Sequence, residues 1–300
     1  MMVNYSFIIP HRNSLRLLER CLDSIPYRDD IEIIIIDDNS DIESRAQASR
    51  KDTRIIFIDE LHSKGAGRAR NYGVKEAVGK WLVFADCDDY FVPGFLDVLD
   101  KYKDLDIEVV YYNAQAVHTV SLAPMPGFLR SRNNYFSSYD GSKKAEDAIR
   151  FKLHAPWWKM VRRDFIEKYQ IQFEEVPKGN DVFFTYQVGT FAKKISVESK
   201  QLYVYTYNPD GITHGRKNKE IYLSSLHRMM KANSFLMYIG YPEWRYDIPR
   251  YWMRIIKHDG LGVFLQTVFT YCMNYKTLSS TKMEYIEKIS PRINDGRGDV

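Results

Sequence analysis

The chain has 300 residues, of which 45% are hydrophobic and 14% aromatic, so it can bury a sizeable core and is not expected to be disordered. Its net charge is only +4 and its basic excess lies in the C-terminal tail without a recognised motif, which argues against a nucleic-acid-binding protein. The cysteines Cys21, Cys87 and Cys272 lie far apart, which indicates reduced thiols in a cytoplasmic protein rather than a disulfide framework.

The sequence shows no membrane span. The N-terminus enters a predicted strand within a few residues, so we expect no signal peptide. The longest apolar candidate, Leu261–Met273, is interrupted by Gln266 and is too short to cross a bilayer. We therefore expect a cytoplasmic protein, either free or peripheral at the inner face of the membrane.

Strands and helices alternate over the first 115 residues. Apolar runs predict strands at Tyr5–Pro10, Ile31–Ile36, Arg54–Ile58 and Trp81–Ala85, and the strand pattern resumes in "EVVYYNAQAV". The isoleucine run of the second segment suits a strand that is covered on both faces.

Helices are predicted between these strands. The first is "LRLLERCLDSI", which Asn13 or Ser14 can cap; the second is "GRARNYGVKEAVG", ended by Gly79; the third opens at Pro93. This order predicts an α/β fold with a mixed, mostly parallel sheet flanked by helices, whose ligand site lies outside the carboxyl ends of the strands. From Lys217 onward the pattern predicts a C-terminal helical appendage.

Polar residues collect where three predicted strands end, in "PHRN", "DDNS" and "DCDD". These ends should face one crevice, although helix capping is an alternative for each cluster. In extended chain Asp86 and Asp88 point the same way, and close carboxylates repel each other unless a cation or a proton neutralises them. We therefore expect Mn²⁺ or Mg²⁺ here, with a phosphorylated substrate supplying further ligands.

The glycine-containing stretch Lys64–Gly73 lacks the GxGxxG spacing of dinucleotide-binding proteins and follows the third strand rather than the first. Its backbone N–H groups and its basic residues still suit a diphosphate at a helix start. The alternative is a surface loop with solvated basic side chains.

Together these segments resemble the family 2 glycosyltransferases, which have the nucleotide-binding, Rossmann-like GT-A fold. The motifs "FIIPHRN", "IIIIDDNS", "GAGRARNYG" and "FADCDD" carry the resemblance over residues 1–115, and a weaker match in "WWKMVRRDFIEK", "GNDVFF" and "YTYNPDGIT" continues to residue 215. The resemblance implies a catalytic domain at 1–215, with a nucleotide-sugar-binding half (1–115) and an acceptor-binding half (116–215), followed by a helical region at 216–300.

The resemblance also implies roles for single residues on the donor side. Asp38 would bind the nucleotide base, and the other nucleotide-sugar-binding positions would be Pro10, Arg12, Gly67, Arg70, Asp86 and Asp88. Asp88 would hold the metal ion. His214 is a second candidate metal ligand, or else a solvated loop histidine.

On the acceptor side the resemblance implies that Asp181 is the catalytic base. The residue before it, usually acidic in the family, is Asn180 here. The alternative for Asp181 is a helix N-cap. Trp157 and Trp158 could form an apolar platform for a sugar ring, or they belong to the core.

The resemblance implies an inverting glycosyltransferase of the hexosyltransferase type, which moves a sugar from a UDP-linked or related donor to a glycan or polyprenyl-linked acceptor in surface polysaccharide biosynthesis. A sugar nucleotidyltransferase is one alternative, although "PHRNSLR" lacks the glycines that it would need. A non-catalytic nucleotide-sugar-binding subunit is another. The C-terminal helices would contact a membrane peripherally, or pack on the catalytic domain or a second subunit as a homodimer.

Overall fold

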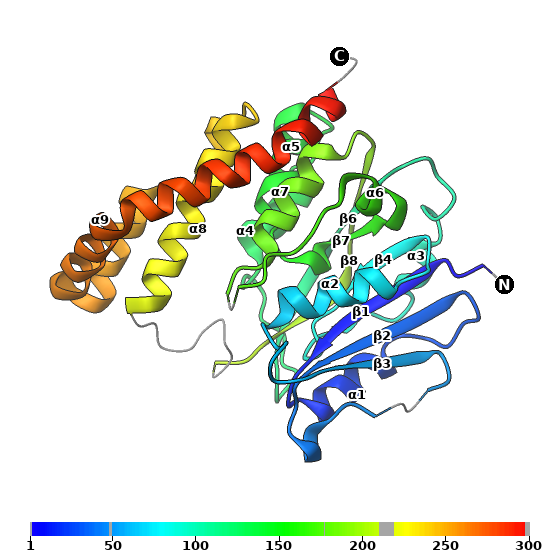
Figure 1. Cartoon of the computed structure of the whole chain (residues 1–300). Coiled ribbons are helices and arrows are strands. Elements are labelled where there is room, and N and C mark those ends of the chain that lie inside the picture. Colours follow the sequence, from blue (N-terminus) through cyan, green and yellow to red (C-terminus); the bar gives the residue numbers. More distant parts are fainter. Residues whose placement is uncertain (1, 48–49, 177, 210–218, 298–300) are drawn as a thin grey trace. The chain divides into compact units, whose positions relative to one another are not determined.

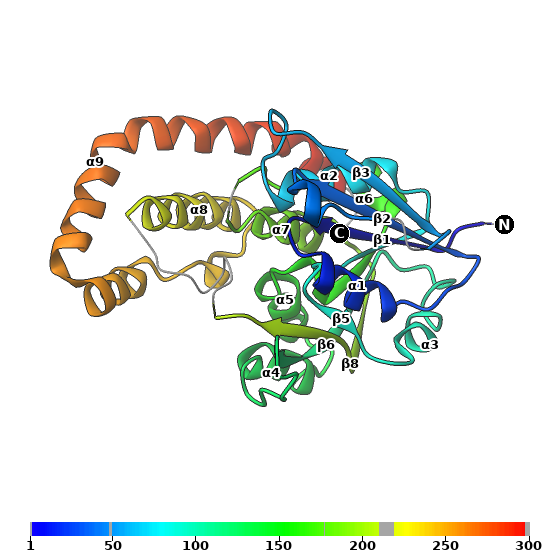
Figure 2. The same ribbon diagram turned by 90° about the horizontal axis from the view of Figure 1, so that it is seen from below.

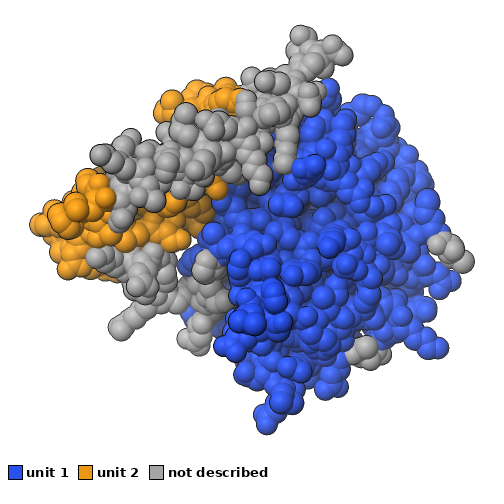
Figure 3. Space-filling view, in the orientation of Figure 1, with its two compact units in different colours: residues 1–209 blue, residues 210–300 orange. Residues whose placement is uncertain are grey.

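The computed structural model describes residues 2–47, 50–176, 178–209 and 219–297. The chain forms two compact units, Met1–Pro209 and Asp210–Val300, drawn in blue and orange in Figure 3. The sequence-based boundary at residues 215 and 216 lies outside the described residues. The expected division at residues 115 and 116 falls inside one strand, so the two halves share a single sheet.

The elements of the first unit follow one another along the chain as shown in Figure 1. They are β1 (Tyr5–His11), α1 (Leu15–Asp23), β2 (Ile31–Asp38), η1 (Ile42–Ser44), β3 (Thr53–Ile58), α2 (Ala66–Glu76), β4 (Trp81–Phe84), β5 (Tyr90–Phe91), α3 (Phe95–Leu99), β6 (Val109–His118), α4 (Arg130–Ser137), α5 (Lys143–Lys152), η2 (Pro156–Trp158), β7 (Lys159–Arg162), α6 (Arg163–Tyr169), α7 (Asp181–Phe191) and β8 (Ile195–Tyr207).

These strands form one mixed sheet in the order β3-β2-β1-β4-β7-β6-β8-β5. The pairs β2–β3, β1–β2, β1–β4 and β6–β8 are parallel, whereas β7 runs antiparallel to β4 and β6, and β5 antiparallel to β8. The chain moves toward one edge after β1 and toward the other after β3. Right-handed crossovers therefore place α1 and α2 on opposite faces, as Figures 1 and 2 show. The predicted fold class is confirmed.

The core forms where the apolar runs of the sequence lie between these helices. Ile33–Ile36 of β2 are all fully buried, as their uninterrupted run predicts. Helix α2 packs closely on this part of the sheet through Gly73, because a Cβ there would lie 2.4 Å from Ile8 Cγ2 and 2.8 Å from Ile36 Cδ1. Only glycine allows so short a distance between the helix and the strands.

Three local predictions about the helices are wrong. Helix α2 ends at Glu76, before Gly79. Helix α3 begins at Phe95, two residues after Pro93, because Gly94 at φ +75° cannot continue a right-handed helix. Helix α1 has no side-chain cap: the Ser14 hydroxyl donates to the Arg12 carbonyl, and Asn13 bonds to Asp41 instead.

The second unit is helical, as predicted. It contains α8 (Lys219–Tyr238), η3 (Pro242–Trp244) and α9 (Ile248–Arg297), and the non-helical backbone of Gly260 kinks α9. Helices α8 and α9 pack together, and the Asn233 side chain binds both the N–H and the carbonyl of Tyr246. Within the described part of the chain, no helix combines the length and the apolar character that a membrane crossing requires.

Candidate active site

The carboxyl ends of β1, β2 and β4 meet at one edge of the sheet. The parallel register pairs His11 of β1 with Asp37 of β2 and Ile8 of β1 with Phe84 of β4. The polar segments that follow these strands therefore lie beside one another, as their sequence predicts.

Two aspartates at the end of β2 have different tasks. Asp37 accepts the backbone N–H groups of Ser40 and Ala46, each at 2.8 Å, and so fixes the loop after the strand. Asp38 is 4% exposed, and its Oδ2 accepts the N–H of Gly65 at 3.0 Å. Its Oδ1 is buried and makes no hydrogen bond. A buried acceptor without a donor suits the N–H group of a nucleotide base.

The loop after β4 holds three aspartates with different environments. Asp86 is paired with Arg70 and is one-third exposed. Burial and the neighbouring Asp86 raise the pKa of Asp88 to about 6, although the positive charges of Arg20 and Arg70 act in the opposite direction. Asp89 is 1% exposed, and burial followed by the charge of Asp88 raises its pKa well above the ordinary value.

Strand β8 fixes this loop, and sequence reasoning missed the residues that do so. Asp89 accepts the Tyr203 hydroxyl at 2.9 Å and the Thr206 N–H at 2.7 Å. The Asp88 carbonyl accepts the Thr206 hydroxyl and an N–H of Arg20, each at 2.6 Å. The sequence offered two signals for this contact, the extra aspartate Asp89 in "DCDD" and the tyrosines of "YVYTY". It does not show that these residues bind each other.

Arg70 connects the aspartate loop to the start of α7. It is 5% exposed; its Nη2 binds Asp86 Oδ1, and its Nη1 donates to Asn180 Oδ1 at 2.9 Å. Gly67 lies one turn earlier, where a Cβ would be 2.0 Å from the Glu174 carbonyl oxygen and 2.8 Å from Asn180 Cβ. The glycine at position 67 is thus required for packing against the segment before α7.

Asp181 is the first helical residue of α7, and the N-cap position belongs to Asn180. The capping alternative for Asp181 therefore does not hold. The side chain of Asp181 is partly exposed. Behind it lies Lys159, which is fully buried and donates to the Leu153 carbonyl at 2.9 Å, the Ala155 carbonyl at 3.2 Å and Thr185 Oγ1 of α7 at 3.1 Å.

Burial lowers the pKa of Lys159 to about 7, and the negative charge of Asp181 acts in the opposite direction. The three acceptors match the three N–H groups of an ammonium, so they also favour the charged form. Lys159 belongs to the "WWK" segment, but its sequence position gave no indication that it is buried behind Asp181.

The other predicted acceptor-side and metal residues lie elsewhere. Trp157 and Trp158 are 5% and 3% exposed, so they belong to the core and do not form an open platform. Trp157 stacks on Tyr203 with ring centroids 4.9 Å apart, and Trp158 stacks on Phe136. Through Tyr203, Trp157 therefore supports the aspartate loop from behind. His214 lies outside the described residues.

The side chains at this edge of the sheet provide some of the oxygen ligands that a divalent cation needs. The carboxylate of Asp88, next to that of Asp86, is the kind of oxygen ligand that Mn²⁺ and Mg²⁺ use together with phosphate oxygens. The described residues contain no cluster of three or more His, Cys, Asp and Glu side chains suited to a metal ion. A cation here would therefore need ligands from the substrate or from undescribed residues.

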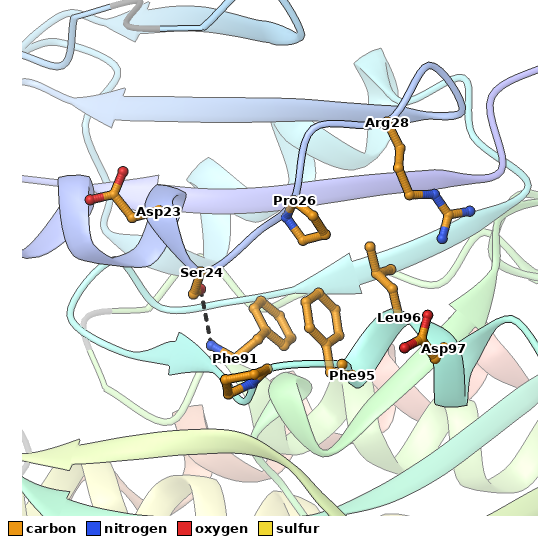
Figure 4. A pocket seen from close by; sticks show the side chains of 10 residues that line it. Asp23, Ser24, Pro26, Arg28, Phe91, Phe95, Leu96 and Asp97 are labelled. Carbon is orange, nitrogen blue, oxygen red and sulfur yellow. Dashed lines mark hydrogen bonds between the residues drawn. The ribbon is translucent and has the colours of Figure 1, made fainter.

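A separate cavity of about 470 Å³ lies between the end of α1 and the start of α3 (Figure 4). Phe91 and Phe95 line it, and the Ser24 hydroxyl there accepts the N–H of Phe91. None of the candidate site residues lines this cavity. The site at the strand ends is therefore distinct from it.

Comparisons with known proteins agree with this fold. Residues 6–169 match the family model "Glycosyl transferase family 2". The glycosyltransferase GlyA of Streptococcus pneumoniae is 23% identical over 287 residues, which cover 88% of this chain and 39% of GlyA. The Campylobacter jejuni GalNAc(5)-diNAcBac-PP-undecaprenol beta-1,3-glucosyltransferase is 25% identical over 249 residues, 81% of this chain and 73% of that protein.

Among solved structures, residues 1–349 of S. aureus TarS in complex with UDP-GlcNAc give a TM-score of 0.62 at 19% identity, covering 88% of this chain and 79% of the TarS chain. This likeness supports the GT-A fold. The chain spans less than two thirds of the length of three curated relatives that it matches, GlyA among them.

Proposed function

The chain belongs to glycosyl transferase family 2, whose model matches more than half of it, and we propose that it is an inverting glycosyltransferase. It transfers a hexose from a nucleoside-diphosphate sugar, which we take to be UDP-linked, to a hydroxyl group of the acceptor. The acceptor is a glycan or a polyprenyl-linked oligosaccharide of surface polysaccharide biosynthesis.

One observation carries this proposal: Arg70 binds Asp86 and Asn180 at once. Asp86 belongs to the loop where a donor diphosphate is expected, and Asn180 directly precedes the candidate base Asp181. The groups for the two substrates therefore lie at one edge of the sheet, within reach of a single buried side chain.

The chain's own residues account for donor binding. Asp38 accepts an N–H of the nucleotide base through its free Oδ1. Pro10 near the end of β1 and Arg12 directly after the strand border the base. Asp86 and Arg70 lie beside the ribose and the diphosphate. A Mn²⁺ or Mg²⁺ ion held by Asp88, with His214 as a further candidate ligand, would supply positive charge to the departing diphosphate.

Asp181 acts on the acceptor. Its carboxylate accepts the proton of the acceptor hydroxyl while the hydroxyl oxygen attacks the anomeric carbon. The new C–O bond forms as the bond to the diphosphate oxygen breaks on the opposite face, so the configuration inverts in one displacement. The UDP-sugar complex of TarS and the polyprenyl substrate in the name of the C. jejuni relative support the chosen donor and acceptor classes.

The C-terminal unit is proposed to contact the membrane or a second subunit. In α9 the side chains of Leu261, Leu265, Phe269 and Met273 are 55–72% exposed. If these side chains bind a membrane, removing the chain from about Tyr241 should abolish sedimentation with anionic liposomes. If the full-length protein does not bind liposomes and the truncated protein loses a dimer, the side chains pack between subunits instead.

A donor screen tests the proposed activity. Purified protein is incubated with UDP-, GDP- and dTDP-sugars and a polyprenyl-diphosphate-linked saccharide, with Mn²⁺, Mg²⁺ or EDTA, and release of nucleoside diphosphate is measured. Acceptor-dependent release from one donor, with inverted configuration of the product by NMR, is the expected result. Pyrophosphate formation from a sugar phosphate and a nucleoside triphosphate would indicate a nucleotidyltransferase instead.

A further inference from the structure

Asn180 occupies the N-cap position of α7 but does not cap the helix. Its backbone is already helical, with φ −61° and ψ −16°, and its side chain makes no capping hydrogen bond. Asn180 is 8% exposed, and its Oδ1 accepts Nη1 of Arg70 at 2.9 Å. The amide therefore serves a tertiary contact rather than the helix end.

The partner of Asn180 is held rigidly from two directions. Arg70 is pinned to Asp86 through Nη2, and its guanidinium lies 5.5 Å from the ring centroid of Phe173. Phe173 in turn stacks on Phe184 of α7 with ring centroids 3.9 Å apart. A planar guanidinium fixed in this way transmits displacements from one partner to the other, because its two Nη groups cannot move independently.

The backbone around Asn180 has little room to adjust. Its carbonyl accepts the N–H of Glu174 at 3.1 Å, and Gly67 of α2 lies directly against its Cβ and the Glu174 carbonyl. A shift of Arg70 in α2 must therefore move the first turn of α7, which begins with Asp181.

We propose that the hydrogen bond from Arg70 to Asn180 couples the donor-side carboxylate Asp86 to the start of α7, so that Asn180 is the positioning residue for Asp181. Donor binding changes the environment of Asp86, and the Arg70 guanidinium passes the change to Asn180. Asp181 then reaches its working position only when a donor is bound. This inference rests on the proposed function in giving Asp181 its role as base.

The test compares three variants with the wild type. Asn180→Ala removes the side-chain oxygen that accepts the Arg70 hydrogen bond but keeps the Cβ. The helix loses no cap, because the Asn180 side chain makes no capping hydrogen bond. Asn180→Asp restores an acceptor oxygen to Arg70. Asn4→Ala is the matched control, since the Asn4 amide also makes a tertiary hydrogen bond, donating to Asp30 Oδ2 at 2.7 Å, but lies at the amino end of β1, opposite the carboxyl end where the candidate site lies.

Two measurements are made on each protein. Calorimetry gives the affinity for UDP with Mn²⁺, and hydrogen exchange of peptides covering residues 178–191 gives the response of α7 to UDP. With the donor found by the screen, kcat and KM are measured as well. We expect Asn180→Ala to bind UDP within about twofold of wild type, to lose the response of α7 and to lower kcat about tenfold or more, the scale of losing an oriented catalytic group.

Asn180→Asp should restore both the α7 response and kcat, and Asn4→Ala should keep both. The coupling is overturned if Asn180→Ala retains the α7 response and kcat, or if Asn180→Asp restores neither. Should Asn180→Ala fail to fold, Arg70→Lys replaces it: lysine can bind Asp86 but cannot span both partners. At a UDP concentration that saturates this variant, the α7 response should be absent, and an intact response would contradict the coupling.

Two outcomes for the wild-type protein distinguish the coupling from the proposed function. A wild-type protein that shows the α7 response to UDP but transfers no sugar from any donor contradicts the proposed function and supports the coupling. A wild-type protein that transfers sugar but shows no response of α7 contradicts the coupling alone.

Discussion

The hydroxyl of Tyr203 donates to the buried carboxylate of Asp89 at 2.9 Å while it accepts the backbone N–H of Asp86 at 3.0 Å. One phenol on β8 thus fixes both ends of the loop that carries Asp86 and Asp88. The shape of the candidate donor site therefore depends on a strand that arrives more than a hundred residues later in the chain.

Tyr203→Phe should weaken both the fold and the donor site. The ring would still fill its place beside Trp157, but Asp89 and the Asp86 N–H would each lose a partner, at a cost of about 1–3 kcal/mol for a buried group. Urea unfolding and UDP calorimetry should show lower stability and weaker binding. Tyr102→Phe, which removes a partly buried hydrogen bond to Glu198 at 3.1 Å, is the control and should leave UDP affinity unchanged.

Asp181→Asn should separate catalysis from structure. An amide of the same shape cannot accept the acceptor's proton, so transfer should fall by about 10²-fold or more, while UDP affinity and thermal stability stay near wild type. Asp164→Asn is a matched control, because Asp164 is also in a first helical turn but is exposed. Turnover of the Asp181 variant close to that of the control would mean that the base is another residue.

The proposed metal role gives a binding prediction. UDP should bind much more tightly with Mn²⁺ than with EDTA, because the cation would relieve the repulsion between Asp86 and Asp88 and neutralise the diphosphate. Asp88→Asn should remove most of this difference without lowering the melting temperature, because its side chain is not among the groups that fasten the loop to β8. Equal UDP affinity of the wild type in both buffers would exclude the metal role.

Lys159 should make stability depend on pH. Burial lowers its pKa in the folded protein to about 7 from 10.5, so between these pH values the unfolded chain binds more protons than the folded one. The stability of the wild type relative to Lys159→Met should therefore rise from pH 7 to pH 10, by at most about 1.4 kcal/mol per pH unit, and should be constant below pH 7. Urea unfolding at several pH values measures the difference, and a flat profile would show that the three acceptors keep the ammonium charged throughout.

Gly67→Ala should be far more damaging than its helical position suggests. The added Cβ would meet the Glu174 carbonyl at 2.0 Å, and backbone cannot move aside cheaply, so the segment before α7 must shift. We expect a lower melting temperature and lower transfer. Gly262→Ala, where a Cβ meets nothing within 4 Å, should be neutral or stabilising by up to about 1 kcal/mol.

The first four strands of the sheet, their parallel arrangement and the edge where their carboxyl ends meet were all predictable. The isoleucines of β2 and the apolar run of β4 are continuous apolar segments, and such a segment predicts a buried strand from the residues next to one another in the sequence. Parallel strands joined by right-handed crossovers then place their carboxyl ends together. The aspartates at the strand ends and the helical tail followed from the same local signals, whereas the family followed from the resemblance of the ordered motifs to known members.

Local signals did not determine which polar groups bind each other. In the sequence, Asn180 was only a departure from the acidic residue usual in the family, and Trp157 was either a platform for a sugar ring or a core residue. The sequence offers no partner for either within a few positions. In the folded chain Arg70 reaches Asn180 across 110 positions and Tyr203 reaches Asp89 across 114. Hydrophobic periodicity is set by neighbours along the chain, whereas a buried polar group must find a partner wherever the topology brings one, so only the tertiary structure decided these pairs.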